Sequence, residues 1–522
     1  MGKKKFNITG TCYPDLHYMM DNRSKLDAIQ SMVVEGAYFV INRPRQYGKT
    51  TLLALLAERL SVASGYLPIE VNFQGVDSHW YASDSAFATM VARQMHKALS
   101  YAIPEQEALL QQLADVGRME GLSDAITAIV QQLDKKIVLI VDEVDASSQH
   151  EPFLSFLGML RSKYLLRFKP MHATFHSVVL AGVHDIKTLK SKLRGEHAEQ
   201  YNSPWNIAAD FTVDLSFNPE EIRPMLASYA EAESVKLDTI FFAQRLHDLT
   251  GGHPFLISKL CKLIAETVLP KSHRDAWSAE DLEKAIQLLL NENNTNFDSL
   301  IKNLENNPEL YQLVYEVIVN GMEITFNPHE SVISHGRLYG ILRENGSVKI
   351  HNPIYEQVIY NYMTAKVFQA HLQNRQADFP TRFETEDGHL DMKAVLLKFQ
   401  DYMREQYSGK DQPFLEREWR LVFLAFLKPI INGKGYDFKE PQVSEEKRLD
   451  IVVTYQQYKY VIELKRWYGP KRHEKGVRQL VDYLDRQAVS KGYLIVFEHQ
   501  GEKSWRQTDL ELDGKHVFAV WI

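Results

Sequence analysis

The sequence predicts an α/β protein in which two sheet-containing segments are separated by a helical stretch. Apolar runs alternate with helical patterns from Ala37 to about Val183, which indicates a parallel sheet with crossover helices. From Pro219 to about Val367 the pattern is mostly helical, and a further α/β segment starts near Gln412.

The first α/β segment contains short apolar runs that predict strands. "TTLLALLAERL" is a strong helix former, so a helix is predicted from Lys49. Further helical patterns continue through Leu133. The predicted strands are "AYFVIN" at 37–42, "LPIEVNF" at 67–73, "KKIVLIVD" at 135–142 and "SVVLAGV" at 177–183.

The helical stretch begins with "EEIRPMLASYAEAE", "TIFFAQRLHDLT" and "FLISKLCKLIAETVL", and the strand-like "GSVKIHN" comes later. This order indicates a helical lid followed by a winged-helix module. The polar stretch "QNRQADFPTRFETEDGHLD" separates that module from the amphipathic helix "MKAVLLKFQDYM". We therefore place the last domain boundary near residue 412.

Composition excludes several classes of protein. The chain has 522 residues, of which 45% are hydrophobic and 24% charged, as in ordinary globular proteins. Its two cysteines, Cys12 and Cys261, cannot build a disulfide framework or a cysteine-based zinc site from one chain. This scarcity of cysteines suits a reducing cytoplasm, and since no apolar run approaches the ~20 residues of a membrane span, we expect no membrane contact. The net charge of −7 restricts any nucleic-acid contact to a local patch.

The stretch "NRPRQYGKTT" is close to a phosphate-binding loop of the form G-x-x-x-x-G-K-[ST]. Arg43 stands at the first glycine position, so the loop must turn differently there. In such loops the amides and the lysine hold phosphates, and the hydroxyl binds Mg²⁺. The sequence therefore predicts an ATP site at Pro44, Arg45, Gln46, Tyr47, Gly48, Lys49, Thr50 and Thr51, with Thr50 as a Mg²⁺ ligand.

A second element follows in "IVLIVDEVD", an apolar strand that ends in two acidic residues, as a Walker B element requires. Asp142 is predicted to hold Mg²⁺, and Glu143 to orient or deprotonate the attacking water. A buried strand that meets a solvated acidic turn is the simpler alternative, and the phosphate loop upstream disfavours it.

These motifs, together with "HYMMDNRSKLDAIQ", "VVLAGVHDIKTLK", "NSPWNIAADF" and "LTGGHPFLISKL", resemble the AAA-like ATPases related to the STAND and archaeal-type ATPases. The resemblance covers about the first 365 residues, and in it an arginine at the start of the loop is usual. It implies that Gly252 and Pro254 of the lid lie near the nucleotide. Tyr18 either contacts the base or packs internally. Arg194 is a candidate arginine finger, and His184 is either a polar sensor or a core histidine.

The C-terminal segment reads as a β-hairpin in "EKRLDIVVTYQQYKYVIELKRW". Asp450 lies on the first arm, and Glu463 and Lys465 lie two apart on the second, on the same face. Two carboxylates can hold a metal that activates water, and a lysine can help to place or deprotonate that water. A surface hairpin with mixed charges is the alternative.

The order of helix, hairpin, helix and strand resembles the PD-(D/E)XK nuclease core. Gln479 and Tyr483 match the Q-x-x-x-Y motif of its RecB-like branch, and the resemblance implies that Gln479 is catalytic and that Glu418 is an accessory metal ligand. Leu449, not proline, precedes Asp450. The domains expected are a P-loop NTPase core with a parallel sheet at 1–215, a helical lid at 216–300, a winged-helix module at 301–370, a linker and helix at 371–411, and a restriction-endonuclease-like nuclease domain at 412–522.

A basic, aromatic stretch, "KRWYGPKRHEKGVR", follows the hairpin. This composition suits a phosphate backbone with bases that stack on aromatic rings, and a solvated basic face is the alternative. We expect contact with DNA, with RNA as the alternative partner, through the region of Lys471 and Arg472.

Taken together, these motifs predict an ATP- and Mg²⁺-dependent switch that controls a nuclease in a homo-oligomer, and fusions of this kind suggest a role in defence or in mobile elements. One alternative is a signalling or scaffold ATPase whose nuclease-like domain binds nucleic acid or protein without cutting. Another is a transcriptional regulator that acts through the winged helix.

Overall fold

The computed structural model describes most of the chain. The described residues are 3–183, 205, 207–272, 274–319, 322–367, 383–385, 387–406, 412–431, 435–439, 450–455, 458–467, 469–486, 489–498 and 503–522. Within its helices and strands, the side chains at 272, 367, 406, 412–418, 429, 435–439, 450, 470–473, 475 and 486 are not described. The chain divides into two compact units. The first comprises Met1–Leu300 and Asn327–Arg343, and the second comprises Ile301–Phe326 and Glu344–Ile522. Among the described helices, none is long and apolar enough to cross a membrane.

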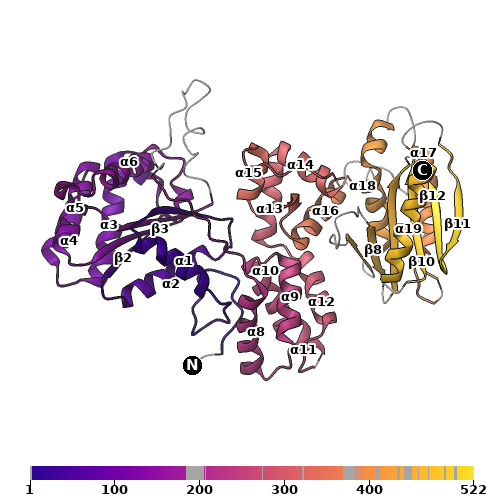
Figure 1. Cartoon of the computed structure of the whole chain (residues 1–522), viewed down its shortest axis with the longest axis horizontal. Helices are drawn as coiled ribbons and strands as arrows, with labels where there is room; N and C mark the ends of the chain where they lie inside the picture. Colours follow the sequence, from indigo (N-terminus) through magenta and orange to yellow (C-terminus); the bar gives the residue numbers. More distant parts are fainter. Residues whose placement is uncertain are drawn as a thin grey trace. The chain divides into compact units, whose positions relative to one another are not determined.

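The first unit is built on a four-stranded sheet in the order β1-β4-β3-β2. Figure 1 labels two of these strands, β2 and β3, among the helices of the unit. All of its strand pairs are parallel, which confirms the predicted sheet. The predicted strand at 67–73 is shifted by one residue. The strands are β1 (Tyr38–Asn42), β2 (Tyr66–Asn72), β3 (Lys136–Asp142) and β4 (Ser177–Gly182).

Helices cover both faces of this sheet because successive strand residues point to opposite sides. Tyr38 and Val40 belong to one core with α3, α5 and α6, whereas Phe39 and Ile41 belong to another with α1 and α2. The helices are α1 (Arg23–Val34), α2 (Lys49–Val62), α3 (Asp84–Ala102), α4 (Glu107–Ala114), α5 (Met119–Gln132) and α6 (Glu151–Leu166), with short 3₁₀ turns η1 (Ser78–Tyr81), η2 (Val144–Ala146) and η3 (Pro170–His172).

A helical stretch follows, as predicted. Its first helix starts with a capping box, in which the Asn218 side chain accepts from the Glu221 amide and the Glu221 carboxylate accepts from the Asn218 amide. The elements are α8 (Pro219–Glu233), α9 (Thr239–Thr250), α10 (Pro254–Leu263), the π-helical turn η5 (Ile264–Val268), α11 (Leu269–Ser272) and α12 (Ala279–Leu290).

The next elements have the helix and strand order that a winged-helix module requires, and that assignment stays a prediction. They are α13 (Thr295–Glu305), α14 (Pro308–Ile318), α15 (Ser331–Leu338), a two-stranded sheet of β5 (Leu342–Asn345) and β6 (Ser347–Ile350), and α16 (Pro353–Val367).

The C-terminal sheet has six strands in the order β11-β12-β10-β9-β8-β7 and is mixed. Here β10 pairs in parallel with both β9 and β12, while the β8–β9 hairpin and the β11–β12 pair are antiparallel. Neither β7 nor the β11–β12 pair is predicted from the sequence. The elements are α17 (Met392–Gln406), α18 (Gln412–Ile431), β7 (Gly435–Lys439), β8 (Asp450–Tyr455), β9 (Tyr458–Arg466), α19 (Pro470–Arg486), β10 (Lys491–Phe497), β11 (Gln507–Leu512) and β12 (Lys515–Trp521).

Candidate functional site

The phosphate loop joins β1 to α2, as the sequence predicts. Gly48 caps the helix in the left-handed region, with φ of 76°, and Gln46 also has a positive φ of 60°. The first amides of a helix lack intrahelical partners and attract anions. The loop therefore has the backbone form of a phosphate site.

Lys49 lies inside this loop and is only 8% exposed. Its Nζ donates to the carbonyl oxygens of Arg43 at 2.7 Å and Pro44 at 2.9 Å. Burial lowers the pKa of Lys49, and the carboxylates of Asp145 and Glu143 counteract this shift. The ammonium is thus held at the loop by nearby negative charge.

Arg43 explains how the loop turns without its first glycine. Its amide donates to the Gly182 carbonyl at 3.1 Å. Its guanidinium donates to the carbonyls of Asn42 at 2.9 Å and Val213 at 2.6 Å and lies over the Phe211 ring. Burial lowers the pKa of Arg43. The side chain ties the loop to the segment before the lid instead of crowding the turn.

The two predicted Mg²⁺ ligands meet directly. Thr50 Oγ1 donates to Asp142 Oδ2 at 2.8 Å, although the residues lie 92 positions apart. Mg²⁺ in nucleotide sites is commonly held by one or two carboxylates together with phosphate oxygens and water. The pair fits that pattern. Among the described residues, no group of three or more His, Cys, Asp or Glu side chains is arranged to hold a metal ion.

Glu143 follows Asp142 in a strained turn with φ of 55°. Its amide donates to Asp142 Oδ1 at 2.8 Å, which fixes the turn. Burial raises the pKa of Glu143, the Asp142 charge adds to the shift, and Lys49 counteracts it. A carboxylate with a raised pKa is suited to accept a proton from water.

Asp145 is a further residue of this site, and the sequence did not predict it. Its Oδ2 accepts from the Val183 amide at 2.5 Å, and a Cβ built on Gly182 would lie 3.0 Å from its Oδ1. Asp145 therefore ties the acidic turn after β3 to the end of β4. The only available signal was the third carboxylate of "VDEVD".

The lid residues lie against the phosphate loop. The ring of His253, between the predicted residues Gly252 and Pro254, packs edge-on against Tyr47 with centroids 4.4 Å apart, and Gln46 Nε2 donates to Thr295 Oγ1 at 3.1 Å. This contact brings Gly252 and Pro254, the neighbours of His253 in the chain, close to the loop. Arg45 of the loop is exposed.

The N-terminal segment also reaches the loop, but not through Tyr18. The Cys12 amide donates to Thr51 Oγ1 at 3.0 Å. Tyr18 is buried against Phe6 and Tyr229, and its hydroxyl donates to Glu233 Oε1 at 3.1 Å. Burial raises the pKa of Tyr18 to about 12. In this structure Tyr18 packs internally. Arg194 and His184 lie outside the described residues.

The second predicted site lies on the C-terminal hairpin. The β8–β9 register places Asp450 directly opposite Glu463. Glu463 is 2% exposed and forms an ion pair with Lys465, as expected for residues on one strand face. Lys465 Nζ also lies 3.5 Å from Gln479 Oε1 of α19. The structure therefore brings Glu463, Lys465 and Gln479 together.

Other residues of this site are only partly described. The positions of Glu418 in α18, Asp450 in β8, and Lys471 and Arg472 in α19 are given by their elements, while their side chains lie outside the described part. Tyr483, also in α19, is buried in the hydrophobic core of the C-terminal sheet.

The AAA-like domain family matches residues 14–361. No curated protein matches the chain. Similar solved structures include the Aeropyrum pernix ORC2 protein in ADPNP–ADP complexes, with 16% identity over 66% of this chain and 94% of that chain and a TM-score of 0.38. They also include the Aeropyrum pernix ORC1 protein in complex with DNA, at 13% identity over 68% and 94% with a TM-score of 0.31. The Thermotoga maritima RuvB Holliday junction branch migration motor has 16% identity over 66% and 96% with a TM-score of 0.32.

Proposed function

The chain belongs to the AAA-like domain family over residues 14–361 and is a P-loop ATPase, and we propose that this ATPase is a switch that controls a Mg²⁺-dependent nuclease acting on DNA. The ATPase half is supported by the meeting of Thr50 with Asp142 beside Lys49. DNA as the partner and a homo-oligomeric assembly are parts of the same proposal.

At the first site, each residue has a defined task. Lys49 would bind the β- and γ-phosphates, and Gly48 allows the backbone to approach them. Glu143 would accept a proton from the attacking water or orient it. Thr50 and Asp142 would hold Mg²⁺, which supplies charge neutralisation on the phosphates.

The observation that carries the nuclease half is the contact of Lys465 with both Glu463 and Gln479. Because Asp450 lies opposite Glu463 in the hairpin, two acidic positions and a lysine occupy one part of the sheet. Asp450 and Glu463, with Glu418 as an accessory ligand, would hold a metal ion, which supplies an activated water. Lys465, oriented by Gln479, would place or deprotonate that water.

The ATPase assignment is tested by nucleotide binding and phosphate release. Lys49→Ala should lose ATP affinity by tenfold or more, since a charge-assisted contact contributes roughly 1.5–3 kcal/mol. Glu143→Gln should bind ATP and fail to turn it over. Arg59→Ala, at the far end of α2, is the matched control. Unchanged ATP binding by Lys49→Ala would refute the phosphate-loop assignment.

The nuclease assignment is tested by nicking of supercoiled plasmid in Mg²⁺ or Mn²⁺, with and without ATP. Glu463→Gln and Lys465→Ala should each reduce cleavage by several orders of magnitude, because each removes a group that holds the metal or places the water. Lys459→Ala, an exposed lysine near the other end of β9, should cut like the parent. If the parent never cuts DNA or RNA, the non-cutting scaffold function replaces the nuclease.

A further inference from the structure

The carboxyl ends of three parallel strands meet at one edge of the C-terminal sheet. The register pairs Arg466 at the end of β9 with Phe497 at the end of β10, and Val496 of β10 with Trp521 at the end of β12. Arg506 joins this edge because Trp521 donates its amide to the Arg506 carbonyl at 3.0 Å. In sheets with parallel strands, ligands commonly bind at this end of the strands.

Arg506 is exposed and stacked on aromatic rings. Its guanidinium lies 4.1 Å from the ring centroid of Trp521 and 5.3 Å from that of Trp467. Trp521 is buried, whereas Trp467 is half-buried. Within the described part of the chain, the guanidinium makes no hydrogen bond or ion pair. Stacking fixes the plane of an arginine and leaves its N–H groups available for phosphate.

Two further basic residues, Lys503 and Arg466, lie at this edge of the sheet. Lys503 lies over the Phe497 ring, 3.9 Å from its centroid, and donates to the Glu498 carbonyl. Arg466 immediately precedes Trp467 in the chain. The Glu498 carboxylate lies at the same edge and accepts from the Ser504 amide at 2.6 Å, so one acid is present among the cations.

This edge is continuous with the proposed nuclease site, since Glu463 and Lys465 occupy the same strand as Arg466. At about 3.3 Å per residue, Glu463 lies roughly 10 Å along β9 from Arg466. A basic groove with an accessible aromatic ring is how proteins hold single-stranded nucleic acid, because an unpaired base offers its face for stacking.

We propose that Arg466, Trp467, Lys503 and Arg506, the single-strand surface, bind single-stranded DNA and direct it to the Glu463–Lys465 pair. Arg506 contacts the phosphate backbone and Trp467 stacks on a base. The direction of the strand to the catalytic pair rests on the proposed nuclease function. Binding at this surface does not depend on that function.

The test is fluorescence anisotropy of a fluorescein-labelled oligo-dT with the full chain in EDTA, where metal-dependent cutting cannot occur. Arg506→Ala should weaken binding about tenfold at low salt, as loss of one charge-assisted contact does. It should also reduce the salt slope by about 0.7. Lys491→Ala removes a positive charge at the start of β10, the opposite edge of the same sheet, and should bind like the parent.

A second pair of variants tests the stack and guards against misfolding. Trp467→Leu should lose affinity, whereas Trp467→Phe, which retains an aromatic ring, should keep most of it. All variants should retain the parent's thermal midpoint. The proposed surface would be refuted if Arg506→Ala bound oligo-dT as tightly as the parent. It would also be refuted if Lys491→Ala lost as much affinity as Arg506→Ala. Competition by poly-glutamate at equal charge concentration would also refute the surface, because the site would then bind any polyanion and not nucleic acid specifically.

The surface and the proposed function can fail separately. If the parent does not cut in Mg²⁺ yet its oligo-dT binding depends on Arg506 and Trp467, the nuclease is refuted and the surface stands. If the parent cuts plasmid and Arg506→Ala binds oligo-dT as tightly as the parent, the surface is refuted and the nuclease stands.

Discussion

At the scale of single residues, burial acts on the charged groups of the phosphate site in opposite directions. It lowers the pKa of Lys49 and raises that of Glu143, because a low-dielectric environment disfavours the charged form of each. The two groups counteract each other's shift. The site therefore holds groups that are less stable when charged than they would be in water, as is common where chemistry takes place.

The raised pKa of Glu143 makes a prediction about stability and pH. A carboxyl whose folded pKa lies above its unfolded value contributes stability that is fully present below the unfolded pKa and is lost as pH rises through the folded pKa. Glutamine imitates the protonated acid at every pH. Glu143→Gln should therefore be more stable than the parent at pH 8, and the difference should disappear near pH 4.

The measurement is the thermal midpoint of the nucleotide-free protein across this pH range. Glu58→Gln, an exposed carboxyl on α2, is the control. A stabilisation by Glu143→Gln that stays the same at pH 4 and pH 8 would show that the charge of Glu143 is not its cause.

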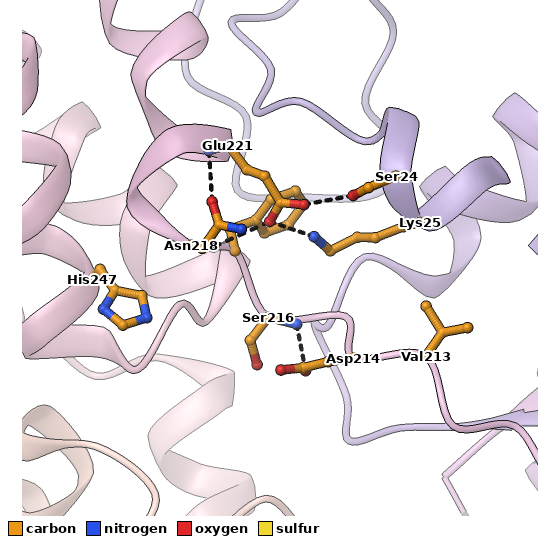
Figure 2. A pocket seen from close by; sticks show the side chains of 9 residues that line it. Ser24, Lys25, Val213, Asp214, Ser216, Asn218, Glu221 and His247 are labelled. Atoms are coloured by element: carbon orange, nitrogen blue, oxygen red, sulfur yellow. Dashed lines mark hydrogen bonds and ion pairs between the residues drawn. The ribbon is translucent and has the colours of Figure 1, made fainter. Parts of the chain in front are cut away.

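At the scale of elements, α1 of the core and α8 of the lid are joined around one carboxylate. Lys25 Nζ forms an ion pair with Glu221 Oε2 at 2.6 Å, and Ser24 Oγ donates to Glu221 Oε1 at 2.6 Å. Lys25 also lies over the Phe217 ring at 4.2 Å. Figure 2 shows Glu221 between the two α1 residues and Asn218, beside a pocket of about 320 Å³. Glu221 thus both caps α8 and holds it to α1.

Lys25→Met should weaken the attachment of α8 to α1. Its Nζ is largely buried, with the side chain 4% exposed, so the substitution leaves the Glu221 charge without its partner, at a cost of about 3 kcal/mol. Urea unfolding followed by tryptophan fluorescence would measure it. The double variant Lys25→Met/Glu221→Gln should recover part of the loss, because it removes the isolated charge. A double variant with the summed loss of both single variants would contradict coupling between the two residues.

The lid also depends on a close backbone approach at Gly252. Its φ is 77°, and its carbonyl accepts from the Phe217 amide at 2.9 Å. A Cβ built on it would lie 2.5 Å from the Phe217 carbonyl oxygen. The segment before α8 therefore fits only against a residue without a side chain.

Gly252→Ala should destabilise the protein by more than the roughly 1 kcal/mol expected from a left-handed alanine alone, and should raise the KM for ATP by shifting His253 from Tyr47. Gly75→Ala is the matched control, since Gly75 has φ of 70° with open space around it. Thermal melting and ATPase kinetics of both variants would measure the difference. Equal destabilisation would mean that strain, and not the contact with Phe217, decides the outcome.

At the scale of the whole molecule, the sequence predicted those features that depend on short patterns. "GKT" after an apolar strand located the loop, and "VDE" located the acidic turn. Their meeting through Thr50 and Asp142 followed because β1 and β3 are parallel strands of one sheet whose carboxyl ends share an edge. The pairing of Glu463 with Lys465 likewise followed from the two-residue period of a strand.

Other features depend on contacts between distant segments and leave no local pattern. Tyr47 contacts His253 although about 200 residues separate them in the chain. Cys12 bonds to Thr51 across 39 positions. Arg506 reaches Trp467 only because β12 pairs with β10 and β10 with β9. Since β11 and β12 were not anticipated, neither was the surface that they complete.

The division of the chain into compact units makes the last prediction. The residues assigned to ATP lie within Met1–Leu300, and those assigned to cleavage lie within Glu344–Ile522. None of the residues assigned to cleavage is also assigned to the phosphate site. Glu463→Gln should therefore abolish nicking and leave ATP turnover within about twofold of the parent, whereas Lys49→Ala should lose turnover and make nicking indifferent to ATP. Phosphate release and plasmid nicking, measured on the same preparations at matched Mg²⁺, test both statements.

If Glu463→Gln also loses ATP turnover while its thermal midpoint is unchanged, the two activities share one site, and the proposed switch is wrong. If nicking by Lys49→Ala still responds to ATP, nucleotide acts on the nuclease through some site other than the phosphate loop.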